Sequence, residues 1–152
     1  MKIWIDADAC PRMTKETVFK AAFRLKVPLV LVANRGMEVP RGALVSLVVV
    51  GKEIDEADRH IARHSAPGDL VVTADIPLAA LLVDRGVVAI DPRGRVFTTD
   101  NVKEALATRN LMHDLRESGI QEGGPAPLGP RDREQFANAL NRELTKLQRR
   151  TG

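Results

Sequence analysis

Short apolar runs that alternate with stretches of helical spacing constrain the fold of this chain more than any other feature. Five such runs, rich in valine, leucine and isoleucine, cover residues 3–5, 29–33, 44–50, 69–75 and 87–91. The segments with helical spacing cover residues 12–26, 54–64, 77–84, 101–118 and 131–150. Strands and helices that alternate in this way are typical of a parallel sheet covered on both faces. The sequence therefore predicts a three-layer α/β/α fold around a mostly parallel five-stranded sheet.

The order of the strands follows from the handedness of their connections. Right-handed crossovers carry the first three strands outward in one direction and the last two in the other, which gives the order 3-2-1-4-5. Ligands of open parallel sheets bind beyond the carboxyl ends of the strands, where this order reverses. The first and fourth strands meet at that point, and their ends carry Asp6, Asp8 and Asp75. We expect these three carboxylates to converge in one crevice.

Crowded carboxylates repel one another unless a proton or a cation offsets their charge. A set of oxygen ligands suits Mg²⁺ or Mn²⁺, so Asp6, Asp8 and Asp75 are predicted metal ligands. Asp58 lies one helical turn from Asp55 and is the expected fourth ligand, while Asp55 is expected to cap its helix. The structural alternative is that Asp6 and Asp8 only end the strand and cap the next helix.

Four further residues at the predicted strand ends are candidates for substrate binding. Thr73 lies two residues before Asp75, so it shares a side of the strand with that carboxylate. Asn34 ends the second strand and could donate to a substrate oxygen. Arg12 and Arg35 lie near the same rim and are the expected phosphate contacts, a role that makes binding depend on salt.

The 152 residues suit a single domain, with a glycine- and proline-rich arm over 119–130 before the last helix, 131–150. That helix has an apolar face that either folds back on the sheet or forms a homodimer. A net charge of +3 is compatible with an anionic partner such as RNA, although aromatic residues are too few for a stacking platform. One cysteine and no membrane-spanning apolar run indicate a cytoplasmic protein without membrane partners.

Four motifs together are similar to those of the YaiI/YqxD family, also called UPF0178, over roughly residues 1 to 147. The motifs lie at residues 5–11, 55–58, 68–75 and 132–136. The resemblance implies a fold like that of the PIN domain, whose members are mostly Mg²⁺- or Mn²⁺-dependent ribonucleases. It matches Asp6 and Asp75 to the acidic residues after strands one and four, and Asp58 to the middle acidic position. Asp8 belongs to the motif of this family in particular.

These expectations favour a nuclease that hydrolyses a phosphodiester, with Asp6, Asp8, Asp58 and Asp75 around Mg²⁺ or Mn²⁺. Two alternatives stay open. Phosphatases similar to haloacid dehalogenases also end their first strand in Asp-x-Asp, and would use Asp6 as nucleophile and Asp8 as acid and base. A PIN-like fold can also bind RNA or a protein without catalysis, because a fold alone does not confer function.

Overall fold

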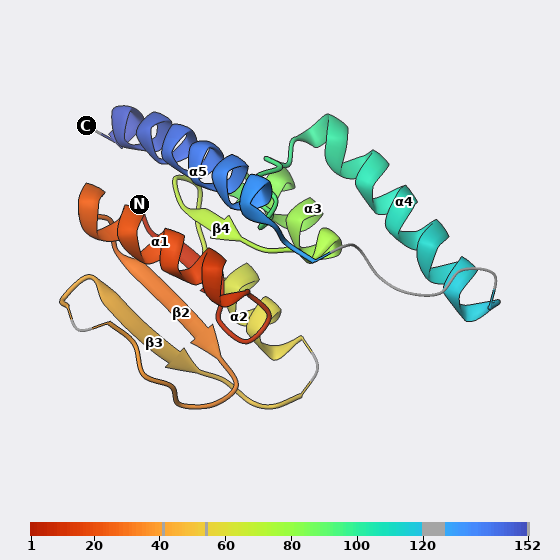
Figure 1. Ribbon diagram of the computed structural model, residues 1–152, viewed down its shortest axis with the longest axis horizontal. Coiled ribbons are helices and arrows are strands. Elements are labelled where there is room, and N and C mark those ends of the chain that lie inside the picture. The colour runs from red at the N-terminus through yellow and green to blue at the C-terminus, as the bar shows by residue number, and fades with distance from the viewer. Residues whose placement is uncertain (41, 54, 120–126, 152) are drawn as a thin grey trace.

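The computed structural model describes residues 1–40, 42–53, 55–119 and 127–151, and contains one parallel sheet of five strands (Figure 1). The strands are β1 (Ile3–Asp6), β2 (Leu29–Ala33), β3 (Val45–Val49), β4 (Leu70–Val72) and β5 (Val88–Ile90). The helices are α1 (Arg12–Leu25), α2 (Glu56–His64), α3 (Ile76–Asp84), α4 (Thr99–Glu117) and α5 (Pro130–Thr151). The strand order β3-β2-β1-β4-β5 confirms the predicted order.

β1 is the central strand, and its side chains divide between two cores. It pairs with β2 on one side and β4 on the other, with Ile3 opposite both Leu29 and Leu70. Ile3 and Ile5 face the layer of α1 and α5, whereas Trp4 faces the layer of α2, α3 and α4. Because both faces are covered, an uninterrupted apolar strand is stable at this position, and the three-layer prediction is confirmed.

The apolar face of α5 is covered by its own chain. Phe136, Leu140, Leu144 and Leu147 are buried in the core that α1 shares with the sheet. Of the two predicted uses of this face, the structure therefore contains the fold-back onto the sheet. A homodimer through the last helix would need a different surface. The part of the predicted arm over 120–126 lies outside the described residues.

α4 lies at the periphery of the fold. Val102 is the one buried residue within its span, Thr99–Glu117, and Figure 1 shows the helix extending from α3 away from the sheet. It begins at Thr99 because the Thr98 hydroxyl accepts from the Asn101 amide and the Asn101 side chain accepts in return. No helix among the described residues is long and apolar enough to span a bilayer.

The largest difference from the predicted elements is at the fourth strand. Residues 69–75 were expected to be extended, but β4 covers only Leu70–Val72. The Thr73 hydroxyl accepts a hydrogen bond from the Asp75 amide at 3.0 Å, which turns the chain toward α3. After β5, Val96 forms an isolated antiparallel bridge to Ile90.

Candidate metal centre

An acidic hollow of about 260 Å³ lies at the carboxyl ends of β1 and β4. Its polar lining consists of Asp6, Asp55, Asp58, Thr73, Asp75 and Cys10. A second hollow of about 310 Å³ adjoins it, because Asp6, Asp55 and Asp58 line both. The acidic hollow therefore occupies the point at which strand order reverses, as the topology predicts.

Asp55, Asp58 and Asp75 form the closest group of carboxylates in this hollow. Each offers one oxygen, and the three oxygens all lie within 4.8 Å of one another. Asp55 and Asp58 come from the start of α2, and Asp75 comes from the loop between β4 and α3. Residues from separate parts of the chain are thus held at a spacing that one cation could bridge.

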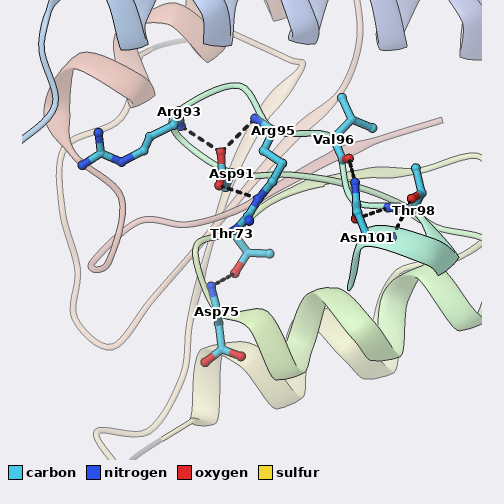
Figure 2. A network of polar contacts seen from close by, with 8 residues as sticks. All are labelled: Thr73, Asp75, Asp91, Arg93, Arg95, Val96, Thr98 and Asn101. Carbon is cyan, nitrogen blue, oxygen red and sulfur yellow. Dashed lines mark hydrogen bonds and ion pairs between the residues drawn. The ribbon is translucent and has the colours of Figure 1, made fainter. Parts of the chain in front are cut away.

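Asp75 is held in place by the helix that follows it. It is the N-cap residue of α3, and its Oδ1 accepts from the backbone amide of Leu78 at 2.8 Å. Its own amide donates to the Thr73 hydroxyl, as Figure 2 shows. The cap therefore uses one carboxylate oxygen of Asp75, and the contact with Thr73 fixes the Asp75 backbone. The position of the second carboxylate oxygen is restricted as a result.

Asp6 enters the acidic hollow from the end of β1. Its Oδ1 accepts from the backbone amides of Asp8 and Ala9, both at 3.2 Å. Burial raises the pKa of Asp6 above its usual value, the two amide bonds lower it, and the charges of Asp8 and Asp75 raise it further. The surroundings of Asp6 therefore disfavour its charged form.

Asp58 carries the strongest perturbation in the cluster. Burial, followed by the charges of Asp75 and Asp6, raises its pKa from 3.8 to about 7. A hydrogen bond from protonated Asp58 to Asp75 and the charge of Asp55 act in the same direction. Near neutral pH the cluster thus binds a proton readily, and a cation of higher charge would relieve the same repulsion.

The structure places three of the four predicted ligands in the acidic hollow and the fourth, Asp8, in the adjoining second hollow. Asp8 is exposed, and its Oδ2 accepts from the backbone amide of Asn34 at 2.6 Å. It lines the second hollow but not the acidic hollow. Asp8 therefore links the loop after β1 to the end of β2, and it lines the second hollow together with Asp6 and Asp58.

Asp55 is the member of the cluster that the sequence prediction assigned to another role. It occupies the N-cap position of α2, but its backbone is left-handed, with φ of 66°, and its side chain accepts no capping hydrogen bond. Its carboxylate faces Asp58 and Asp75 instead. The spacing of Asp55 and Asp58 on one helix face was the feature that could have identified both as ligands.

The predicted substrate-binding residues have different positions. Thr73 is buried and lines the acidic hollow, while Asn34 is exposed and lines the second hollow. Arg12 is exposed and pairs with Glu16 on α1, with Nε to Oε1 at 3.3 Å. Arg35 is also exposed and belongs to the lining of neither hollow. The two arginines are thus outside the hollows themselves.

The fold and the site define a class: an α/β protein with an acidic pocket at the carboxyl ends of a parallel sheet. The chain belongs to the YaiI/YqxD family. The family model described as "Uncharacterized BCR, YaiI/YqxD family" matches residues 4–146. The resemblance inferred from the four motifs is therefore confirmed for the family, and its extension to PIN domains stays a prediction.

Curated relatives cover almost the whole chain. A "UPF0178 protein" of Myxococcus xanthus is 58% identical over 147 residues, which are 97% of this chain and 96% of the relative. One from Geobacter metallireducens is 54% identical over 97% of this chain and 95% of its own length. One from Pseudomonas fluorescens is 52% identical over 99% of this chain and 100% of its own length. No solved structure matches the chain significantly.

Proposed function

We propose that the protein is a metal-dependent phosphodiesterase that cleaves nucleic acid, with RNA as the expected substrate. The observation that carries the proposal is the group of Asp55, Asp58 and Asp75, whose oxygens lie within 4.8 Å in a hollow that Asp6 also lines. In the proposed site these four residues hold Mg²⁺ or Mn²⁺. A cluster of this kind costs folding free energy without a counter-charge, which supports a functional reason for its presence.

The donor set fits a hard divalent cation. All four carboxylates supply oxygen, the ligand that Mg²⁺ and Mn²⁺ prefer. The one soft donor in the lining is Cys10, and burial raises the pKa of its thiol to about 12. One thiol beside four carboxylates makes a predominantly hard donor set, which favours Mg²⁺ or Mn²⁺ over zinc.

The roles of the residues follow from their contacts. A bound divalent ion would supply an acidified water and neutralise charge on a phosphate. The Thr73 hydroxyl already accepts from the Asp75 amide, so its own proton is available for a phosphate oxygen. Asp75 is oriented by its N-cap bond, and Asp58 reaches the same hollow from α2. Together they would position the phosphodiester against the proposed ion.

The geometry gives less support to a phosphatase that uses a phosphoaspartate. That reaction needs Asp6 and Asp8 at one reacting phosphate, with Asp6 as nucleophile and Asp8 as acid and base. The Asp8 carboxylate is bonded instead to the Asn34 amide and lines only the second hollow. The Asp6 Oδ1 is occupied by two backbone amides. The proposed metal site uses Asp6 beside Asp55, Asp58 and Asp75 and needs no contribution from Asp8.

The proposal is tested by incubating the purified protein with single-stranded RNA in Mn²⁺ or Mg²⁺. We compare the wild type with Asp58→Asn and with Asp114→Asn, a matched control on exposed α4. The wild type and the control should cleave equally, and Asp58→Asn should be slower by about 100-fold, which corresponds to about 3 kcal/mol of transition-state stabilisation. Isothermal titration with Mn²⁺ should show weaker binding to Asp58→Asn alone.

Three results would contradict the proposal in different ways. Equal cleavage by wild type and Asp58→Asn would assign the activity to a contaminant. Tight RNA binding without turnover would indicate the non-catalytic module. Turnover of p-nitrophenyl phosphate with a phosphoaspartate trapped at Asp6 would indicate the phosphatase.

A further inference from the structure

A groove lined by three arginines begins beside the acidic hollow. It has a volume of about 690 Å³ and runs between α5 and the turn that follows β5, with Arg93, Arg95 and Arg142 in its lining. Pro92, the residue before Arg93, lines the acidic hollow. The strands that carry the acidic hollow and the groove are also paired, because the Thr73 amide donates to the Ile90 carbonyl at 3.0 Å. We call this feature the arginine groove.

The turn that carries two of these arginines is rigidly built. The Asp91 Oδ1 accepts from the backbone amides of Arg93 and Arg95, at 3.0 and 2.9 Å, as Figure 2 shows. Gly94 has φ of +92°, and a Cβ on this residue would lie 2.7 Å from backbone atoms of Gln135. The turn is therefore packed directly against α5, and the backbone at both arginines is fixed before any ligand binds.

In this groove the acidic side chains are less exposed to solvent than the basic ones. The side chains of Asp91 and Asp132 are 11% and 22% exposed, whereas those of Arg93 and Arg95 are 37% and 48% exposed. Arg142 is 56% exposed. A ligand that enters from solvent thus meets guanidinium groups first, although carboxylates hold two of those groups from beneath.

Arg95 and Arg142 keep donors for a ligand. Arg95 pairs with the Asp91 Oδ2 through Nε at 3.4 Å, and Arg142 pairs with Glu143 through Nε at 3.5 Å. The terminal nitrogens of both guanidinium groups carry further N–H donors, which suit phosphate oxygens. The Arg95 guanidinium also lies 4.7 Å from the centre of the buried Phe97 ring, which fixes its position further.

We propose that the arginine groove binds successive backbone phosphates of a polynucleotide strand while the scissile phosphate lies in the acidic hollow. This inference rests on the proposed function and names how its substrate is held. No aromatic side chain lines the acidic hollow or the groove in the described ranges. Bases therefore find no stacking platform there, and recognition through phosphates is independent of base sequence.

The experiment measures binding of a fluorescein-labelled single-stranded oligouridine by anisotropy in Mg²⁺ at several salt concentrations. Every protein carries Asp58→Asn, so that cleavage of a bound strand is slow during the measurement. The test variant adds Arg95→Gln and Arg142→Gln, and the matched control adds Arg116→Gln and Arg150→Gln, which remove the same charge outside the groove. Loss of two phosphate contacts should reduce the slope of log K against log salt concentration by about 1.4. Between 1 M and 0.1 M salt, the affinity of the test variant should therefore fall behind that of the control by a further factor of about 25.

A second variant and three competitors keep the result specific. Arg142→Gln alone leaves the Asp91 turn intact and should lower the slope by about 0.7. Oligocytidine and single-stranded DNA should compete with oligouridine, because they present the same phosphates. Polyglutamate of equal length should not compete, and its competition in the wild-type groove but not in the test variant would assign the groove to an acidic protein and overturn the proposal.

Equal weakening by the test variant and the control would also overturn the inference, because net charge alone would then explain binding. The inference and the proposed function fail separately. Groove-dependent binding without cleavage by the wild type in Mn²⁺ would leave the inference standing and refute the phosphodiesterase. Cleavage that depends on Asp58, with binding indifferent to the arginines, would do the reverse.

Discussion

The raised pKa of Asp58 predicts that removing this charge stabilises the metal-free protein. The unfolded carboxyl titrates at 3.8 and the folded one at about 7, so the folded state favours the proton. The resulting stability is fully present below pH 3.8 and is lost as the pH rises through about 7. Asp58→Asn keeps an N–H donor for Asp75 but carries no charge, so it should retain that stability at alkaline pH.

The magnitude follows from the two pKa values. The difference between about 7 and 3.8, at about 1.4 kcal/mol for each pH unit, sets a ceiling of about 4 kcal/mol. Asp58 is only half-buried, and solvent screens part of the repulsion from Asp6 and Asp75, which leaves about 1–2 kcal/mol. For a chain of this size that corresponds to an increase of about 3–6 °C in Tm.

The assay is thermal unfolding in EDTA from about pH 5 to about pH 8, with Asp114→Asn as the control. The Tm of Asp58→Asn should exceed that of the wild type by an amount that grows with pH, and the control should follow the wild type. Added Mn²⁺ should then raise the Tm of the wild type more than that of the variant. A Tm difference between Asp58→Asn and the wild type that is absent at about pH 8, or that stays constant with pH, would refute the reasoning.

Three further substitutions test other parts of the structure. Asp69→Ala removes an acceptor that binds the Trp4 indole and two backbone amides, and should cost about 3 kcal/mol in urea unfolding, with altered Trp4 fluorescence. Gly94→Ala places a Cβ against the Gln135 backbone at positive φ, and should cost about 2 kcal/mol and speed amide exchange at the start of α5. Asp75→Ala should lose about 1 kcal/mol from the α3 cap, whereas Asp75→Asn should keep the cap and lose only Mn²⁺ affinity, as melting and titration together would reveal.

The strand order was predictable from the sequence because few topologies satisfy the handedness rule. Once β1 and β4 are neighbours, Asp6 and Asp75 must lie at the same edge of the sheet. The convergence of Asp58 followed from its place in the first turn of α2. General rules about chain connection therefore fixed the neighbourhood of the site, although Asp75 lies in a loop rather than at a strand end.

The details that the sequence could not supply depend on contacts between distant segments. An aspartate at a helix start is equally compatible with capping and with ligation, and the left-handed backbone of Asp55 decides between them. Asp8 is held by the Asn34 amide, a contact that no local pattern encodes. Arg93 and Arg95 line a groove that forms only when α5 packs against Gly94, so no local sequence pattern identifies them.

The central place of β1 has a consequence for how the protein is made. The first strand to leave the ribosome acquires its two neighbours, β2 and β4, at different times, since synthesis proceeds from the N-terminus. Asp6 is therefore translated well before the segment around Asp75 emerges and docks beside it. A nascent chain shorter than that lacks Asp75, so the acidic hollow forms only once β4 has joined the sheet.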